Sequence, residues 1–110
     1  MTDDKLFLIH IAECIARVEE YVQPGREEFL RSGLIQDAVL RNLQVMAEST
    51  QRLSDELKSQ HPSIDWRAIA GFRNVLVHAY LGVDIAKVWE IVASDLPKLR
   101  DAVRAILDER

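Results

Sequence analysis

Apolar residues recur every three or four positions along almost the whole chain, and no segment alternates convincingly as a strand would. This period predicts helices throughout. Proline and glycine interrupt it at Pro24-Gly25, at Pro62 and at Gly82. A chain of 110 residues is long enough for one domain with a modest core. We therefore predict an all-α, up-and-down bundle of four to five helices, with residues 1–110 forming a single domain.

The interruptions divide the chain into predicted helices. We expect them at about Asp3–Val22, Arg26–Arg31, Ile35–Gln60 and Asp65–Leu81, with a further one from Ile85. In the long segment 35–60, one apolar stripe is formed by Val39, Leu43, Met46, Thr50, Leu53 and Leu57.

Capping residues and one proline refine these boundaries. Ser63 or Asp65 is expected to cap the helix that Gly82 closes, and Asp84 to cap the next one. Pro97 lies inside the last apolar pattern. We therefore expect either a kink or two helices that meet near residues 94 and 95.

Composition narrows the function. Net charge is -4 at pH 7, which argues against a broad basic surface that coats nucleic acid but not against a small, locally positive RNA-cutting site. Cys14 is the single cysteine, so neither a disulfide framework nor a thiolate metal cluster is expected. His10, His61 and His78 are far apart and lack ligand spacing, so we expect no metal and no cofactor. No signal peptide or membrane span is indicated, and the expected location is the cytoplasm.

The stretch from Arg73 to Tyr80 carries a cation, an amide, a proton carrier and a phenol within eight residues. Arginine binds phosphate in a planar fork, and histidine gives or takes a proton near pH 7. Residues 66–83 contain no acidic side chain, although the whole chain is negative. An anion could therefore bind near Arg67, Arg73 and His78.

Helical geometry predicts how these side chains are distributed. At about 100° per residue, the core face of this helix is formed by Ile69, Phe72, Val75, Leu76 and Ala79. An apolar strip faces away from the core and is formed by Trp66, Ala70, Val77 and Leu81.

Arg73 and His78 diverge by about 140° around a straight helix. One copy of the helix cannot easily aim both at the same phosphate. Two copies that cross through the apolar strip could, because a twofold axis would bring Arg73 near the partner's His78. We therefore predict a homodimer with composite sites at the contact.

The pattern Arg-x4-His-x-Tyr in an all-helical domain resembles the HEPN ribonucleases, specifically the HepT-like toxins encoded beside a minimal nucleotidyltransferase antitoxin (the HepT/MntA family). Three further segments extend the resemblance over most of the chain from Gln36 onward: residues 38–48, 64–74 and 83–89.

This resemblance implies an endoribonuclease toxin of a type VII toxin–antitoxin system, active as a dimer without a metal, on an RNA such as tRNA or mRNA. It assigns Arg73 to the scissile phosphate and His78 to general base or acid catalysis. Asn74 would orient His78 or contact phosphate, with Arg67 in support. Tyr80 matches the position at which the partner nucleotidyltransferase attaches AMP, whose charge and bulk would oppose RNA entry.

Each of these residues also has a plainer interpretation. His78 and Asn74 could be ordinary polar residues of a helix surface, Arg73 a cation paired with an acidic residue, and Tyr80 a side chain packed at the border of the core. Two other functions follow from those interpretations. The chain would be a non-catalytic helical binding module that partners a nucleotidyltransferase, or a plain dimerisation scaffold.

Overall fold

The computed structural model describes residues 2–82 and 84–109, so Met1, Val83 and Arg110 of the predicted domain lie outside the described residues. All regular structure in the described part is helical. The elements are α1 (Thr2–Tyr21), α2 (Arg26–Arg31), α3 (Gly33–Gln51), α4 (Asp55–Gln60), α5 (Trp66–Tyr80), α6 (Ile85–Glu90), the π-helical stretch η1 (Ile91–Asp95) and α7 (Leu96–Glu109).

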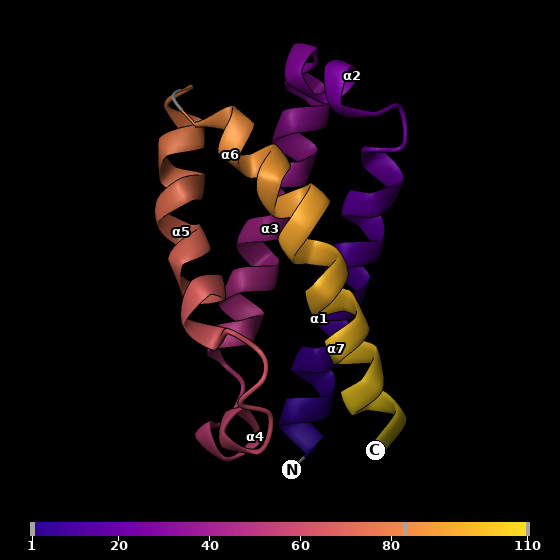
Figure 1. The fold of residues 1–110 in the computed structure, drawn as a ribbon, viewed down its shortest axis with the longest axis vertical. Helices are drawn as coiled ribbons and strands as arrows, with labels where there is room; N and C mark the ends of the chain where they lie inside the picture. Colours follow the sequence, from indigo (N-terminus) through magenta and orange to yellow (C-terminus); the bar gives the residue numbers. More distant parts are fainter. Residues whose placement is uncertain (1, 83, 110) are drawn as a thin grey trace.

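The long elements form four rods side by side, as predicted for an up-and-down bundle (Figure 1). Helices α1 and α5 run in one direction, and α3 and the rod formed by α6, η1 and α7 run in the other. The short helices lie at opposite ends, α2 beside the top of α3 and α4 at the bottom. Helix α5 stands at the edge of the bundle, which leaves much of its surface uncovered.

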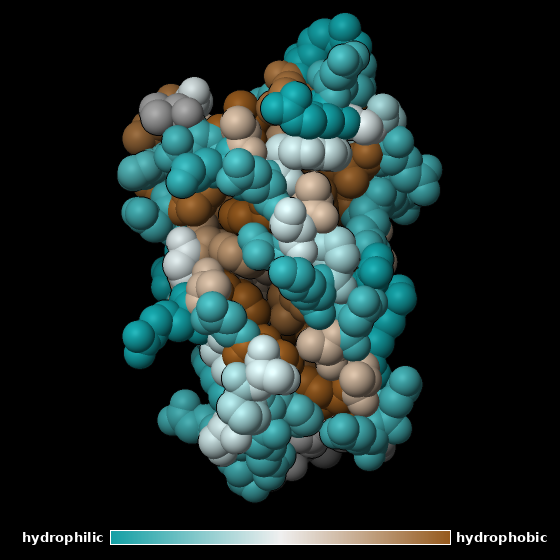
Figure 2. Space-filling model, viewed as in Figure 1, coloured by the Kyte–Doolittle hydropathy of each residue, from teal (hydrophilic) through white to brown (hydrophobic). Residues whose placement is uncertain are grey.

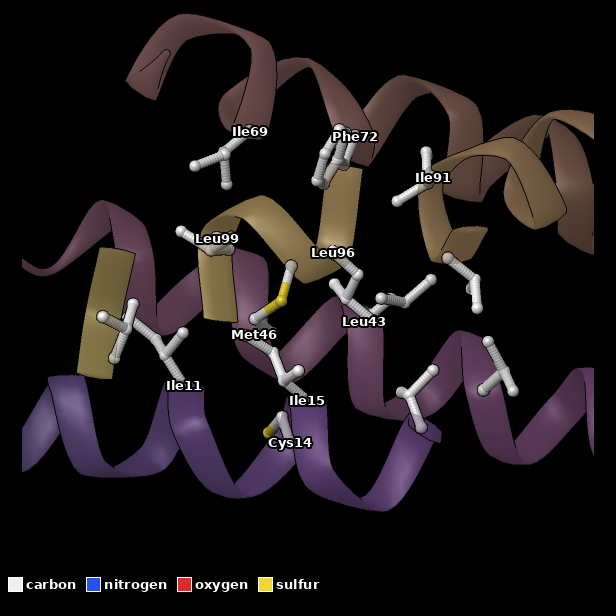
Figure 3. Packing of buried hydrophobic residues seen from close by; sticks show 14 of the residues in the cluster. Ile11, Cys14, Ile15, Leu43, Met46, Ile69, Phe72, Ile91, Leu96 and Leu99 are labelled. Carbon is white, nitrogen blue, oxygen red and sulfur yellow. The ribbon is translucent and has the colours of Figure 1, made fainter. Parts of the chain in front are cut away.

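The core is built from the apolar faces of all four rods. Figure 3 shows its centre, where the labelled side chains are Ile11, Cys14, Ile15, Leu43, Met46, Ile69, Phe72, Ile91, Leu96 and Leu99. A buried aliphatic or aromatic side chain of this size stabilises a fold by about 1.5–3 kcal/mol. Burial also raises the pKa of the Cys14 thiol, which makes it a poor nucleophile.

The predicted single helix Ile35–Gln60 is wrong. Helix α3 ends at Gln51, and Ser54 begins the separate helix α4 by accepting a hydrogen bond from the backbone N–H of Leu57 (3.1 Å). The buried carboxylate of Asp4 holds this break, because it accepts bonds from the Ser54 backbone N–H (2.9 Å) and hydroxyl (2.6 Å). The predicted stripe is nevertheless buried on both sides of the break, including Leu53 and Leu57.

The irregularity predicted near residues 94 and 95 is present in the form of η1. There the backbone N–H of Leu96 bonds to the carbonyl of Ile91, five residues earlier. Pro97 follows directly and has no N–H to give to a helical bond. A wider π-helical turn before a proline is one way to continue a helix with one backbone donor missing. Helices α6 and α7 consequently form one rod.

Within residues 2–82 and 84–109, no helix is both long and apolar enough to cross a membrane.

Replacing Ser54 tests whether its bonds with Asp4 of α1 stabilise the break between α3 and α4. We expect Ser54→Ala to lower the free energy of unfolding by about 1–3 kcal/mol, because it removes the cap of α4 and one donor to a buried carboxylate. Urea denaturation followed by circular dichroism measures this loss. Ser59→Ala is the control, since that exposed hydroxyl donates only to the carbonyl of Glu56. Equal losses in the two variants would contradict the connection.

Candidate active site on helix α5

Local sequence sets both ends of α5. The side chain of Asp65 accepts a hydrogen bond from the backbone N–H of Ala68 (2.9 Å), which makes it the N-cap that was one of two predicted alternatives. At the other end, Gly82 has a φ of 80° and donates to the carbonyl of Ala79 (2.8 Å). Glycine adopts this left-handed conformation at little steric cost, so it closes the helix as predicted.

Helix α5 is attached to the bundle along one face only. Ile69, Phe72, Leu76 and Ala79 are buried there, and Val75 is half-buried, which confirms the predicted core face. In Figure 3, Ile69 and Phe72 point from α5 toward the rods below. This face contacts α3 and α6, so the rest of the helix is free to carry chemistry.

The predicted apolar strip lies on the uncovered side. Leu81 is 73% exposed and Val77 is 58% exposed, and Ala70 is exposed with them. Trp66 differs, because its half-buried indole N–H donates to the backbone carbonyl of Lys58 at 3.2 Å. Trp66 is therefore held by its own chain, and the freely exposed strip consists of the other three residues.

Two glutamines of α3 hold the motif side chains on one edge of α5. The guanidinium Nη1 of Arg73 donates to Oε1 of Gln51 at 3.0 Å. The hydroxyl of Tyr80 donates to Oε1 of Gln44 at 3.4 Å, a long bond. Gln44 and Gln51 are seven residues apart on α3, and Arg73 and Tyr80 are seven residues apart on α5. The bonded partners follow each other in opposite order along the two helices because α3 and α5 run antiparallel.

The positive charge of Arg73 has no carboxylate partner in the described part of the chain. Its bonded partner, Gln51, is a neutral amide. Arg100 shows the contrast: its guanidinium bonds to Asp101 and Glu19, and those bonds raise its pKa further. An exposed guanidinium held by an amide keeps donors and a full charge for an incoming anion such as phosphate.

His78 lies on the opposite edge, in the last turn of α5. Its side chain is 50% exposed, and Nδ1 lies 3.1 Å from Oδ2 of Asp84. If Nδ1 carries the proton in this contact, Nε2 is left with a lone pair that can accept a proton from a substrate. A solvent-accessible imidazole of this kind can act in proton transfer.

The structure keeps the predicted site residues in two groups on one chain. Arg73 and Tyr80 share the edge beside α3, and His78 occupies the other edge, as helical geometry predicted. Asn74 and Arg67 are exposed, and neither forms a side-chain hydrogen bond within the described residues. The site residues of a single chain therefore do not converge.

The molecule also has a groove away from Arg73 and His78, and its lining does not suit an anion. A groove of about 440 Å³ runs between α5 and α7, with Phe72 and Leu99 in its lining, and Figure 2 shows apolar surface open there. The carboxylates of Asp65 and Asp95 also line it, against a single cation, Lys98. Within the described residues no three His, Cys, Asp or Glu side chains are grouped to hold a metal ion.

Three residues at the site were not found from the sequence. Gln44 and Gln51 carry no recognisable pattern of their own, and only the pairing of α3 with α5 reveals them. Asp84 was predicted only as a helix cap. Its position six residues after His78, just beyond the turn at Gly82, was the available indication that the chain returns toward the imidazole.

Comparisons with known proteins identify the family of this chain. Residues 11–106 match the family described as "Ribonuclease HepT-like". The chain belongs to the HepT-like ribonuclease family. Membership supports a ribonuclease function and agrees with the all-helical fold. No solved structure matches the chain significantly.

Individual relatives of the chain have names that include a ribonuclease. A Thermococcus cleftensis protein described as "Probable ribonuclease HepT" is 38% identical over 87% of this chain and 88% of its own length. A "Putative RNase" of Methanocaldococcus jannaschii is 31% identical over 94% of this chain and 96% of its own. Another protein of that organism, described as "Gamma-glutamylcyclotransferase and putative RNase", is 36% identical over 97% of this chain, which spans about half of that relative.

The importance of a neutral partner for Arg73 can be tested by replacing Gln51 with a charged residue. We expect Gln51→Glu to weaken binding of an uncleavable 2′-O-methyl RNA by roughly tenfold, because the new carboxylate pairs with Arg73 and competes with phosphate. Fluorescence anisotropy measures the affinity. Gln60→Glu makes the same charge change at an exposed position at the end of α4 and should have a much smaller effect. Equal weakening would mean that only net charge matters.

Proposed function

We propose that this chain is an endoribonuclease toxin that acts as a homodimer, with each active site shared between two copies of α5. The proposal rests mainly on one observation: a guanidinium bonded to a neutral amide and an accessible imidazole lie on opposite edges of an exposed apolar strip. Covering that strip with a second copy removes apolar surface from water and supplies the missing half of each site. Residues 1–110 would form one such domain.

Symmetry restricts how two copies of α5 can meet. In a side-by-side antiparallel pair, a twofold axis places each edge of α5 beside the same edge of the partner's α5. Arginine then faces arginine, and histidine faces histidine. A steep crossing instead brings Arg73 toward the partner's His78. The two residues are about 7.5 Å apart along the helix, so the crossing point must lie midway between them. The exposed residues nearest that point are Asn74 and Val77.

The proposed reaction is an attack of the ribose on its own phosphate. Arg73 binds the phosphate oxygens, and Nε2 of the partner's His78 takes the proton from the 2′-hydroxyl. The 2′-oxygen forms a bond to phosphorus while the bond from phosphorus to the 5′-oxygen breaks. The 5′-oxygen then takes a proton from the imidazolium or from water, leaving a 2′,3′-cyclic phosphate and a 5′-hydroxyl. These steps need no metal.

Mixing two inactive variants tests the shared site. We expect Arg73→Ala and His78→Ala each to abolish cleavage of total RNA when present alone. When the subunits are mixed and allowed to exchange, half of the dimers contain one intact Arg73–His78 pair, so about a quarter of the wild-type activity should return. Gel analysis of RNA fragments with cyclic-phosphate ends measures it. A mixture as inactive as its components would place the site within one chain.

Val77→Glu is the control for that experiment. A carboxylate near the crossing point should produce monomers, seen by light scattering, and should prevent recovery when it is added to both variants. Wild-type protein that leaves RNA intact would instead favour a non-catalytic binding module.

Tyr80 is proposed to be the site at which a cognate nucleotidyltransferase silences the toxin by attaching AMP. Tyr80 is 54% exposed, and within the described part of the chain its hydroxyl is held by a single long bond to Gln44. Tyr80 lies about two helical turns from Arg73 on the same edge. An attached phosphate would bring negative charge close to Arg73 and oppose RNA there electrostatically.

Mass spectrometry tests this modification. After incubation with the nucleotidyltransferase and ATP, wild-type protein should gain the mass of one or more adenylyl groups and lose RNA cleavage. Tyr80→Phe should gain no mass and keep its activity. Tyr21 is the chain's other tyrosine, so Tyr21→Phe is the matched control and should be modified like the wild type. Modification of Tyr80→Phe would contradict the proposal.

A further inference from the structure

Asp84 occupies the N-cap position of α6 but does not use its side chain as a cap. Its backbone carbonyl accepts bonds from the N–H groups of Lys87 (3.0 Å) and Val88 (3.2 Å), so the helix begins there as expected. Its carboxylate forms no bond with the first turn of α6. Ser32, Ser54 and Asp65 do form such side-chain caps at α3, α4 and α5.

The carboxylate of Asp84 is directed instead to the imidazole of His78. Oδ2 lies 3.1 Å from Nδ1. A glycine turn connects the two residues: the N–H of Leu81 bonds to the carbonyl of His78, and Gly82 follows with positive φ. The turn therefore returns the chain to the edge of α5 that carries His78.

A carboxylate on Nδ1 has a defined chemical consequence. An ionised carboxylate only accepts hydrogen bonds, so a neutral imidazole beside it must carry its proton on Nδ1. Nε2 is then the unprotonated nitrogen and is available as a base. The carboxylate also stabilises the imidazolium that forms when Nε2 takes a proton.

We propose that Asp84 is a positioning residue that fixes the tautomer and ring orientation of His78 for RNA cleavage. The inference rests on the proposed function for its purpose, although the tautomer can be measured without RNA. Asp84 acts through His78 and need not contact the substrate.

The first measurement uses wild-type protein labelled with ¹⁵N in histidine. At a pH where the imidazole is neutral, the nitrogen shifts of His78 should show the proton on Nδ1. His10 and His61 lack a carboxylate contact within the described residues and serve as internal references. The resonances of His78 are identified by their loss in His78→Gln. A His78 protonated mainly on Nε2 would overturn the proposal.

The second measurement uses Asp84→Asn and Asp84→Ser. Both replacements are good N-cap residues, so α6 is retained. We expect the Nδ1–H population of His78 to fall in each variant and the turnover number for RNA to drop by at least about tenfold, with little change in KM. Asp108→Asn removes the same charge in the last turn of α7 and should change neither quantity, because the C-terminal end of α7 lies far from the turn between α5 and α6 (Figure 1).

The two readouts separate the possible failures. Lost activity with an unchanged His78 tautomer would overturn the positioning role. Unchanged activity with a changed tautomer would overturn it as well. A wild type that cleaves no RNA would remove the proposed function, and the tautomer measured in the same sample would show independently whether Asp84 still fixes His78.

Discussion

The packing of one face of α5 onto α3 determines what the remainder of that helix can do. Ile69, Phe72, Leu76 and Ala79 must be buried, and helical geometry then fixes the direction of every other side chain. The motif residues consequently lie in solvent, on a rigid element rather than on a loop. The same constraint separates Arg73 from His78. The exposure of the motif residues and the separation of Arg73 from His78 are therefore two results of a single packing arrangement.

The electrostatics of the exposed surface of α5 depends on the absence of acidic side chains from this helix. The chain is net negative, yet no acidic side chain occurs between Asp65 and Asp84. Neutral glutamines of α3 hold Arg73 and Tyr80, so the cationic edge is fixed without being neutralised. The first carboxylate after this interval, Asp84, contacts the edge that carries His78. On a single chain, the carboxylate that contacts His78 and the guanidinium of Arg73 therefore lie on opposite edges of α5.

The sequence predicted those features that depend on local periodicity and missed those that depend on contacts across the fold. The buried face of α5 follows from neighbouring residues, and Asp65 was one of the two caps predicted for it. The break after Gln51 does not, because the apolar stripe continues through it and the stabilising carboxylate of Asp4 is fifty residues away. The pairing of Arg73 with Gln51 likewise requires the antiparallel register of α3 and α5. Periodicity contains no information about that register.

The exposed strip connects stability with catalysis in the proposed dimer. An isolated chain leaves Val77 and Leu81 largely in water, and the proposed partner would cover this apolar surface. In the side-by-side antiparallel arrangement, a partner would cover the strip with each edge beside the same edge of the other copy. That arrangement would remove apolar surface from water but would not form a site. A steep crossing of the two helices would meet both conditions in the proposed dimer. Ala70 belongs to this strip and is small and exposed, so in the proposed dimer it leaves room for a second helix to cross closely.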